Sequence, residues 1–217
     1  MNFASLKQLI KSKNLVEEPH LRDFSEEELN GRNQGLKEVK EILCSLNIKF
    51  LLGGGVLLGA IRDKDFIKWD WDVELELYTE EVIDKVDIIK DNFSANNFEV
   101  KVVDVSYENF KINVIKYNSK YTLEGLHKKG KYRVRKTFKY PAKYFVNTKK
   151  ILFRGEFYMA PYPPEEFLAF TYGDWRTPIK SSNKREYLSS SIFRDSWPTK
   201  IKYFLENVVF HLRTKFR

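Results

Sequence analysis

Four acidic side chains alternate with apolar ones over the short stretch 69–77. The carboxylates are Asp70, Asp72, Glu74 and Glu76, and tryptophan, valine and leucine fall between them. Strict alternation is typical of a β-strand, in which side chains two residues apart point to the same face. Neighbouring carboxylates would then lie roughly 7 Å apart, given a rise of about 3.3 Å per residue. One divalent ion would fit between two of them.

Like charges on one strand face repel one another, at a cost of several kcal/mol in a half-buried setting. A bound cation removes this cost. Oxygen ligands favour Mg²⁺ or Mn²⁺, and proteins commonly hold Mg²⁺ by one or two carboxylates together with substrate phosphates. The pattern therefore indicates metal-dependent phosphoryl chemistry. The alternative is an amphipathic strand whose acidic face is solvated and neutralised by lysines.

Three consecutive glycines, Gly53, Gly54 and Gly55, precede the acidic stretch and follow a short apolar run. They open a helix predicted for residues 56–62, which ends at Arg62. Glycine lets main-chain amides approach a ligand closely, and a helix N-terminus favours phosphate. The turn is neither a Walker loop nor a Gly-x-Gly-x-x-Gly dinucleotide turn. Its proximity to the carboxylates predicts phosphate donors opposite a metal ion.

This stretch resembles the LicD and fukutin-related phosphotransferases, which are built on a nucleotidyltransferase-type fold. Their pattern is Gly-Gly-Thr-Leu-Leu-Gly-Ala-x-Arg, a Gly-Phe-Ile turn and Pro-Trp-Asp-Asp-Asp-Ile-Asp. Most of its positions match residues 54–62, 65–67 and 68–74. A second segment looks like the family's Tyr-Leu…Tyr-Gly-x-x-Trp…Pro sequence and contains Phe167, Leu168, Tyr172, Gly173, Asp174, Trp175 and Pro178. The matches bracket about residues 35–180.

Members of that family transfer a phospho-alcohol, such as phosphocholine or ribitol phosphate, from a cytidine-diphosphate (CDP) donor to a sugar hydroxyl. The resemblance implies that Asp70 and Asp72 bind Mg²⁺ or Mn²⁺ at the donor's diphosphate. Either Glu74 or Glu76 is a candidate base for the acceptor hydroxyl. The candidate catalytic residues are Asp70, Asp72, Glu74 and Arg62, and the candidate phosphate-binding (cofactor-binding) residues are Gly53, Gly54, Gly55 and Lys68.

Three positions within the motif depart from the family pattern. Val56 stands where the family has threonine, so any contact from that hydroxyl is absent. Trp71 replaces the middle aspartate, but a strand would point it away from the metal face. Glu74 replaces an aspartate and lengthens the reach by one methylene.

A fourth departure concerns the neighbouring strand from which nucleotidyltransferase folds usually draw one more carboxylate. Here the equivalent position is Asn113, whose carbonyl can bind a metal but which cannot act as a base. Asp104 and Glu108 are candidate substitutes. A site that works with fewer charges and an inactive copy of the site are also compatible with this departure.

Length and composition fit one globular domain over residues 1–217, with an N-terminal helical extension over about 1–33. The chain is 42% hydrophobic and 15% aromatic, enough for a core without disulfides. The single cysteine, Cys44, is expected to be a buried small hydrophobe in a reducing compartment. Neither a signal peptide nor an apolar run of about 20 residues is found. The predicted location is cytoplasmic, or peripheral at the inner membrane face.

A net charge of +8 favours an acidic partner. The candidate partners are a nucleotide, an anionic membrane surface and nucleic acid. Lysine, arginine and aromatic residues crowd into 127–150, which suits single-stranded nucleic acid, a nucleotide diphosphate or ordinary strands with a solvated basic face. We expect a CDP-alcohol donor and a glycan or lipid-linked glycan acceptor, and we do not expect nucleic acid. A basic amphipathic helix predicted for 196–213 would either contact a membrane or pack on the core.

The predicted elements alternate between helices and strands, which favours an α/β (α+β) fold with a nucleotidyltransferase-like mixed sheet flanked by helices. Helices are predicted at 34–46, 56–62, 79–92, 163–172 and 196–213, and strands at 48–52, 69–77, 98–104, 109–117, 131–138 and 151–159.

The function predicted from these features is metal-dependent transfer of a phospho-alcohol from a CDP donor to a sugar hydroxyl of a cell-surface polysaccharide or lipopolysaccharide. Two alternatives stay open. One is a nucleotidyltransferase that adds a nucleoside monophosphate to protein or RNA. The second is a non-catalytic, basic nucleic-acid-binding module.

Overall fold

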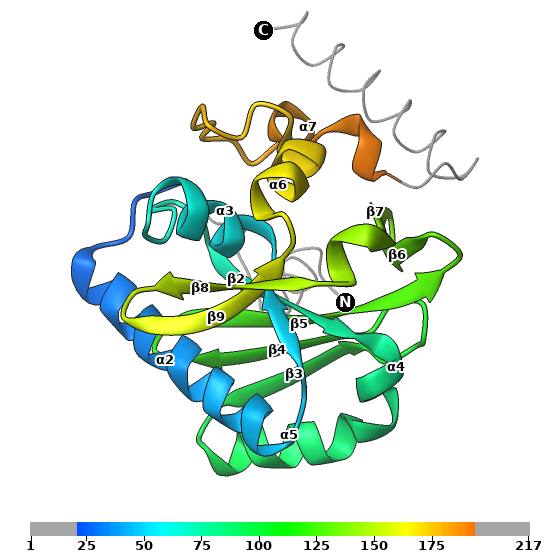
Figure 1. Ribbon diagram of the computed structural model, residues 1–217. Helices are drawn as coiled ribbons and strands as arrows, with labels where there is room; N and C mark the ends of the chain where they lie inside the picture. The colour runs from blue at the N-terminus through cyan, green and yellow to red at the C-terminus, as the bar shows by residue number, and fades with distance from the viewer. Residues whose placement is uncertain (1–20, 194–217) are drawn as a thin grey trace, which may run out of the picture.

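A mixed β-sheet with helices on both faces forms the body of the protein (Figure 1). The structure is a computed structural model that describes residues 21–193. The helices are α2 (Glu26–Ser45), α3 (Gly54–Arg62), α4 (Thr79–Val82), η1 (Ile83–Lys85), α5 (Val86–Ala95), η2 (Ala142–Phe145), α6 (Pro164–Tyr172), α7 (Lys184–Tyr187) and η3 (Ser190–Ile192). The strands are β1 (Phe50–Leu52), β2 (Asp72–Tyr78), β3 (Glu99–Asp104), β4 (Lys111–Lys116), β5 (Ser119–Lys129), β6 (Tyr132–Arg135), β7 (Phe138–Pro141), β8 (Thr148–Phe153) and β9 (Glu156–Pro161).

The main sheet has the strand order β1-β2-β5-β4-β3, and β6 and β7 extend it from the far end of β5. Strands β2 and β5 are parallel, whereas β5 pairs antiparallel with both β4 and β6. Strands β8 and β9 form a separate hairpin. The predicted mixed sheet flanked by helices is confirmed.

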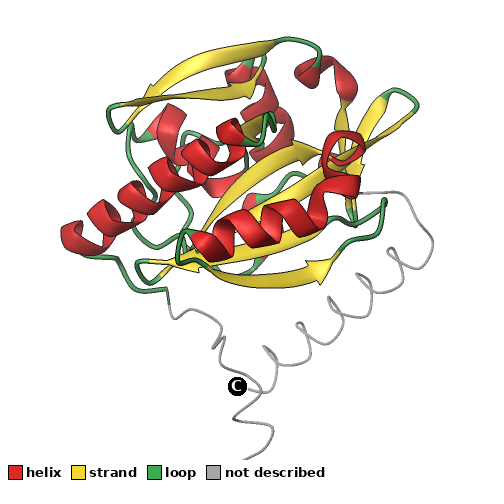
Figure 2. Cartoon of the chain, turned by 90° about the horizontal axis from the view of Figure 1, so that it is seen from below, coloured by secondary structure: helices red, strands yellow, loops and turns green. Residues whose placement is uncertain are grey.

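The sheet has one apolar face and one polar face. Helices α2 and α5 lie side by side over the apolar face (Figure 2). From β2 this face receives Val73 and Leu75, which are fully buried. Tyr121 of β5 aligns with Val73, and its hydroxyl donates to the main-chain oxygen of Arg32 in α2 over 2.8 Å. Because strand side chains alternate, the acidic residues of β2 point to the opposite, polar face.

Helix α2 begins earlier than the sequence pattern indicated. Ser25 is its N-cap and forms a capping box with Glu28, which satisfies main-chain amides in the first turn. The predicted extension over about 1–33 therefore includes the first two turns of a helix that packs on the sheet. The part of that extension before residue 21 lies outside the described residues, as does the predicted amphipathic helix at 196–213.

Three strand predictions were wrong. The strand predicted for 131–138 is interrupted after Arg135, because Lys136, with a φ of 40°, lies in the turn between the antiparallel strands β6 and β7. No strand was predicted for β5, although it is the central strand of the sheet. Tyr117 and Asn118 both have positive φ and form the two-residue loop that joins it to β4. The strand predicted for 151–159 is a hairpin, because Arg154 and Gly155 turn the chain between β8 and β9 with φ values of 46° and 84°.

Cys44 is exposed rather than buried, which corrects the expectation for its side chain. Within residues 21–193, no helix has both the length and the apolar character required to cross a bilayer. The cytoplasmic location stays a prediction.

Candidate active site

The polar face of the sheet forms one wall of a cavity of about 710 Å³. This wall includes Asp72, Glu74 and Glu124, and the first turn of α3 closes one side of the cavity. Residues 167–192 supply the opposite wall, where α6 and the segment through α7 lie above the sheet (Figure 1). The cavity therefore brings the acidic strand, the glycine turn and the second sequence motif together.

Each of the three consecutive glycines lies directly against an acidic side chain. A Cβ atom on Gly54 would overlap the carboxylate of Glu74, and one on Gly55 would overlap the carboxylate of Asp70. Gly54 also has a φ of 46°, which disfavours any residue with a side chain. The glycine turn thus lets carboxylates reach the N-terminus of α3, where first-turn amides have no intrahelical acceptor.

Asp70 lies in the turn before β2 rather than in the strand itself. Its main-chain oxygen accepts a hydrogen bond from Arg32 Nη1 over 2.5 Å. Arg32 is 1% exposed, and its guanidinium lies over the ring of Phe24 at 4.3 Å. This buried cation fixes the main chain of Asp70 and places positive charge behind the carboxylates.

Asp72 opens β2 and pairs with groups on the neighbouring strand β5. Its Oδ2 atom lies 3.1 Å from Lys120 Nζ and accepts a hydrogen bond from Thr122 Oγ1 over 3.1 Å. Lys120 Nζ also lies 3.0 Å from the ring centroid of Trp71. Trp71 lines the cavity, so this residue caps the Lys120–Asp72 ion pair.

A buried arginine, Arg135 of β6, lies against three carboxylates. Its Nη2 atom lies 3.4 Å from Glu74 and 3.6 Å from Glu76, and Nη1 pairs with Glu124. Glu124 also accepts from Lys111 Nζ over 2.7 Å. The side chains of Arg135 and Lys111 thus face the carboxylates of Glu74, Glu76 and Glu124.

The carboxylates differ in acidity because their surroundings differ. Burial, together with the charges of Asp72 and Glu74, raises the pKa of Asp70 to about 8, although Arg32 acts in the opposite direction. Burial also raises the pKa of Glu74, but Arg135 and other nearby cations outweigh it and bring this pKa below its usual value. Asp70 is therefore the carboxyl group whose ionised form its surroundings stabilise least.

The donor set fits a magnesium or manganese ion held by two carboxylates. Within residues 21–193, no group of three or more His, Cys, Asp or Glu side chains is arranged as a complete metal site. Mg²⁺ does not require one, because it commonly keeps several waters and takes other ligands from substrate phosphates. A cation beside Asp70 and Asp72 would take the place of the proton that the raised pKa of Asp70 favours.

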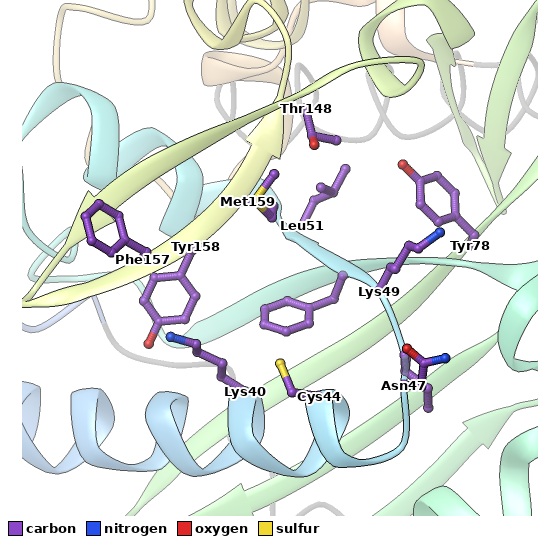
Figure 3. A pocket seen from close by; sticks show the side chains of 12 residues that line it. Lys40, Cys44, Asn47, Lys49, Leu51, Tyr78, Thr148, Phe157, Tyr158 and Met159 are labelled. Carbon is purple, nitrogen blue, oxygen red and sulfur yellow. The ribbon is translucent and has the colours of Figure 1, made fainter.

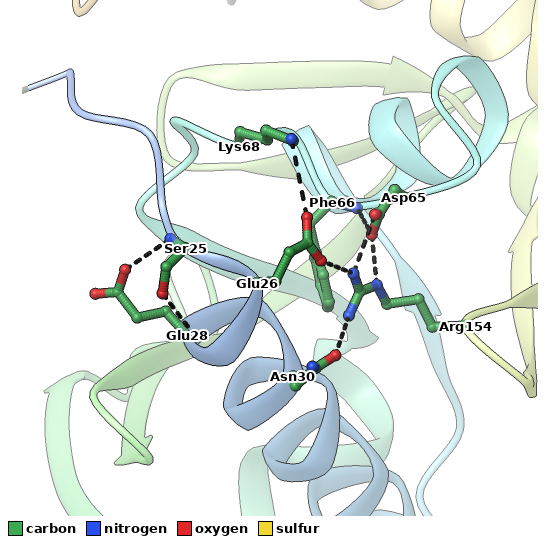
Figure 4. Close-up of polar contacts among 8 residues, drawn as sticks. All are labelled: Ser25, Glu26, Glu28, Asn30, Asp65, Phe66, Lys68 and Arg154. Carbon is green, nitrogen blue, oxygen red and sulfur yellow. Dashed lines mark hydrogen bonds and ion pairs between the residues drawn. The ribbon is translucent and has the colours of Figure 1, made fainter.

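Of the three remaining predicted site residues, Arg62 lines the cavity, and Lys68 and Gly53 do not. Arg62 lines the cavity, but its guanidinium pairs with Asp63 over 2.8 Å. Lys68 does not line the cavity, and its Nζ atom lies 3.8 Å from Glu26 (Figure 4). Gly53 does not line the cavity, and its amide donates to the main-chain oxygen of Glu74.

Glu76 also lies outside the cavity. It is 3% exposed, and burial raises its pKa to about 7, although Arg135 opposes the shift. Of the two predicted bases, only Glu74 lines the cavity.

The neighbouring strand β5 carries a carboxylate, Glu124, which the sequence analysis missed together with its strand. Glu124 aligns with Glu76 on the adjacent strand β2 and lines the cavity. Asn113 is one strand further away, aligned with Thr122. Asp104 accepts hydrogen bonds from Ser106 and Asn109 at the far edge of the sheet and, like Glu108, does not line the cavity. Neither acid replaces Asn113 in this site.

The basic and aromatic segment 127–150 contributes side chains to the core, to the site and to the surface. Tyr140, Tyr144 and Phe145 are buried in the core, and Arg135 is buried in the site. Arg133 pairs with Glu80. The segment therefore builds part of the core and of the site, and its other basic residues are exposed, namely Lys128, Lys129, Lys131, Lys136, Lys143, Lys149 and Lys150. That the protein does not bind nucleic acid stays a prediction.

A second cavity of about 380 Å³ lies on the other side of β1, between α2 and β9 (Figure 3). Lys40, Cys44 and Lys49 line it together with Tyr158 and Met159. Among the described residues no carboxylate lines it, so this part of its wall lacks the acidic metal ligands and the carboxylate base that the first cavity has.

The turn that carries Asp70 is tied at its other end to the β8–β9 hairpin (Figure 4). Arg154 Nη2 donates to Asp65 over 3.0 Å, and Arg154 Nη1 donates to Asn30 of α2 over 3.1 Å. Arg154 also lies 3.6 Å from Glu26. The segment before β2 is therefore held between α2 and the hairpin.

Comparisons with known proteins find one family profile and two relatives that are similar over short stretches. The profile of the LicD/FKTN/FKRP nucleotidyltransferase domain matches residues 47–163, just over half of the chain. Ribitol 5-phosphate transferase FKRP of Homo sapiens is 39% identical over 54 residues, which cover 25% of this chain and 11% of that protein. Lipopolysaccharide cholinephosphotransferase LicD of Haemophilus influenzae is 46% identical over 47 residues, which cover 21% of this chain and 18% of that protein. This chain thus matches less than a fifth of the length of either relative.

Solved structures with a similar fold include a lincosamide antibiotic adenylyltransferase and a nucleotidyltransferase of Thermotoga maritima. The former is 7% identical, with a TM-score of 0.44 over 69% of this chain and 87% of that chain. The latter is 14% identical, with a TM-score of 0.43 over 64% of this chain and 82% of that chain.

Proposed function

This chain belongs to the LicD/FKTN/FKRP nucleotidyltransferase domain family, and from that premise we propose that it transfers a phospho-alcohol from a CDP-activated donor to a sugar hydroxyl of a cell-surface glycan. The family includes phosphotransferases for ribitol phosphate and choline phosphate. The CDP donor, the divalent metal, the glycan or lipid-linked acceptor and the cytoplasmic location belong to the proposal.

The observation that carries the proposal is the contact between the glycine turn and the acidic residues. Gly54 and Gly55 place the N-terminus of α3 against Glu74 and Asp70. Helix amides favour phosphate oxygens, and the carboxylates favour a divalent cation. A diphosphate bound between a metal ion and a helix N-terminus satisfies both sides of this contact.

Asp70 and Asp72 would hold Mg²⁺ or Mn²⁺. When bound, the ion supplies positive charge at the donor's diphosphate and lowers the barrier to phosphoryl transfer. Lys120 fixes Asp72 from the neighbouring strand, and Arg32 fixes Asp70 through its main chain. Such fixed positions matter because phosphoryl transfer depends mainly on orientation and charge stabilisation.

In the proposed reaction, the oxygen of the acceptor hydroxyl bonds to the phosphorus that carries the alcohol. The bond from that phosphorus to cytidine monophosphate breaks, and cytidine monophosphate leaves. Glu74 accepts the hydroxyl proton, because cations keep this carboxylate ionised at neutral pH and it lines the cavity. Arg62 and Lys184 line the same cavity and supply positive charge near the leaving nucleotide.

Calorimetric titration of CDP and its alcohol esters, with and without Mg²⁺, tests the proposal. We expect metal-dependent binding to the wild type and its loss in the Asp70→Asn/Asp72→Asn double variant. The matched control is Asp87→Asn/Asp91→Asn, which removes two carboxylates from α5 on the opposite side of the sheet. Binding that survives in the site variant, or the absence of binding to the wild type, would overturn the proposal.

Product analysis separates the proposed activity from nucleotidyl transfer. After incubation with donor and acceptor glycan, mass spectrometry should find the phospho-alcohol on the glycan and free cytidine monophosphate in solution. A nucleotide covalently retained on the acceptor would instead identify a nucleotidyltransferase.

A further inference from the structure

The β8–β9 hairpin has one face turned to the core and one turned outward. Phe153, Tyr158 and Ala160 point inward and are buried. Because strand side chains alternate, the residues between them point outward. Leu152 and Phe157 lie directly opposite each other on this outward face. The hairpin is the outermost described layer on its side of the molecule, at the top of Figure 2.

Large apolar side chains are concentrated on the outward face. Leu152 is 62% exposed, Phe157 is 51% exposed and Met159 is 36% exposed. The three are contiguous, because Leu152 pairs with Phe157 across the strands and Met159 follows two residues after Phe157. Val146 and Tyr162, which precede and follow the hairpin, are exposed as well. Single exposed apolar residues are ordinary, whereas a contiguous group marks an interaction surface.

The charged residue on the same face is a lysine. Lys150 pairs with Met159 across the strands, and its Nζ atom lies 4.3 Å from the ring centroid of Phe157. Lysine commonly lies along an apolar surface in this way while its ammonium group stays at the polar boundary. Glu156 is the one acidic residue in the sequence of the hairpin, and its carboxylate pairs with Lys40 of α2 over 2.8 Å.

The surroundings of the face add further basic side chains. Lys49 lines the second cavity together with Phe157 and Met159. Both Lys49 and Lys150 are exposed, and no described carboxylate lies within ion-pair distance of either. The apolar group therefore lies beside two lysines whose charge is not neutralised by the described part of the protein.

The nearest acidic residues are at the start of α6 and are already paired. Lys149 Nζ lies 3.9 Å from Glu165, and Lys143 Nζ lies 3.7 Å from Glu166. All four side chains are exposed, so these pairs are weak. They balance one another and leave the positive charge of the outward face in place.

This positive charge argues against two of the possible occupants. The segments 1–20 and 194–217 of the chain are both net basic, so either would bring like charge to the face. A second copy docked through the same face would bring its own Lys150 and Lys49 to those of the first. An anionic surface is attracted instead.

We propose that the outward face of the β8–β9 hairpin docks on an anionic lipid bilayer. Leu152, Phe157 and Met159 enter the boundary between head groups and acyl chains, while Lys49 and Lys150 contact lipid phosphates. Peripheral binding of this kind gains from buried apolar area and from attraction to anionic lipid. The carboxylates and the cavity of the candidate active site take no part, so the inference is independent of the proposed function. It also differs from a membrane contact through the helix predicted at 196–213.

The first test is sedimentation of the full chain with lipid vesicles. One set contains phosphatidylglycerol and phosphatidylcholine in equal amounts, and the other contains phosphatidylcholine alone. We expect the anionic vesicles to bind the protein at least about tenfold more tightly, and added salt to weaken that binding. Leu152→Ser/Phe157→Ser should weaken it at least about tenfold by removing apolar area. Lys49→Gln/Lys150→Gln should weaken it about tenfold by removing charge.

Matched variants control for apolar area and charge elsewhere on the surface. Val103→Ser/Val105→Ser alters two exposed apolar residues that flank Asp104 at the β3 edge. Lys128→Gln/Lys129→Gln removes two exposed lysines at the end of β5. Both should bind the anionic vesicles within about threefold of the wild type, since surface attraction is strong only near the lipid. Thermal unfolding checks that every variant is folded.

The second test locates the contact directly. A nitroxide label is attached to Leu152→Cys in a Cys44→Ser background, which removes the native exposed thiol. When anionic vesicles are added, the label should collide more often with oxygen and less often with a water-soluble nickel chelate. The same label on Val103→Cys should show neither change. This readout does not depend on how tightly any other segment binds lipid.

Four results would overturn the inference. They are wild-type protein that fails to bind anionic vesicles, binding that the two hairpin variants retain in full, a label at residue 152 that stays in water, and a dimer in analytical ultracentrifugation that Leu152→Ser/Phe157→Ser dissociates. The last would assign the face to a second copy. None of these measurements involves CDP, so the proposed function is judged separately.

Discussion

Arg32 and Asp70 are joined by a hydrogen bond of 2.5 Å from a buried guanidinium to a main-chain oxygen. Arg32 belongs to α2, which packs on the apolar face of the sheet, whereas the Asp70 carboxylate belongs to the cavity on the polar face. The bond therefore connects the two layers around the edge of the sheet. Two further nitrogens of Arg32, Nε and Nη2, are buried without a hydrogen-bond partner among the described residues. Such a cation is costly to bury, which indicates that its charge serves the neighbouring carboxylates.

Replacing Arg32 by methionine should weaken both folding and metal binding. The Asp70 oxygen would lose its donor, so we expect the free energy of unfolding to fall by about 1–3 kcal/mol. Mn²⁺ affinity should also fall, because the main chain of Asp70 is no longer fixed. Urea denaturation and calorimetry measure the two effects. Arg32→Lys should recover part of the metal affinity, and Lys37→Met on the same helix should change neither quantity. Unaltered metal affinity in Arg32→Met would contradict the positioning role.

Gly54→Ala should be much more harmful than alanine at another glycine with a similar backbone. The matched position is Gly130, where φ is 57° and a new Cβ would contact nothing within 4 Å. At Gly130, alanine should cost about 1–2 kcal/mol through backbone strain alone. At Gly54 the same strain is joined by overlap with the Glu74 carboxylate. We expect a larger loss of stability in urea and loss of donor binding. Equal effects at the two positions would disprove the importance of the glycine–carboxylate contact.

The bidentate pair between Arg154 and Asp65 should contribute measurably to stability. Both side chains are partly buried, and charge-assisted pairs of this kind are stronger than exposed ones. A double-mutant cycle with Arg154→Met and Asp65→Asn should give a coupling energy of about 1–2 kcal/mol in urea denaturation. The exposed pair Lys101–Glu99 should give no more than about 0.5 kcal/mol. A coupling energy no larger than that of the Lys101–Glu99 pair would show that the Arg154–Asp65 pair does not hold the segment before β2.

The start of α2 should lose stability in acid. A side-chain hydrogen bond from Arg22 is the main cause that lowers the pKa of Glu28 from 4.5 to about 2. Because the folded-state pKa is the lower one, the stabilisation is present above about pH 4.5 and disappears as the pH falls toward 2. The pair is largely exposed, so solvent screening keeps the expected effect small. Glu28→Gln should remove this part of the pH dependence, measured by thermal unfolding between pH 2 and 6. A variant with the wild-type pH profile would refute the assignment.

The acidic strand and the glycine turn were predictable because their signals are local. Alternation predicted that Asp72 and Glu74 share one face of the strand. The three glycines predicted a close approach of another group to the main chain, although not which residues make it. Asp70 was assigned to the strand because it continues the alternation, whereas the chain is still turning there. Periodicity alone does not mark the residue at which a strand begins.

Sequence analysis missed the partners that come from β5 and β6. The signal for β5 was the Tyr117–Asn118 loop, but only Asn118 is a typical residue for a left-handed turn position. With the strand unrecognised, Glu124 had no assigned neighbour. Arg135 was grouped with surface lysines because charge runs are usually solvated. Its burial against Glu74 depends on pairing across strands, which no local pattern reports.

The parallel pairing of β2 with β5 also bears on how the protein folds. Asp72 aligns with Lys120, which follows much later in the chain, and Arg135 comes later still. Parallel pairings between distant segments form slowly. During synthesis the β2 segment therefore emerges before Lys120 and Arg135, and its apolar face is exposed until the sheet forms. The alternating carboxylates then act as gatekeepers, since like charges along the segment oppose intermolecular strand pairing. The carboxylates that line the cavity of the finished protein are thus expected also to oppose aggregation of the nascent chain.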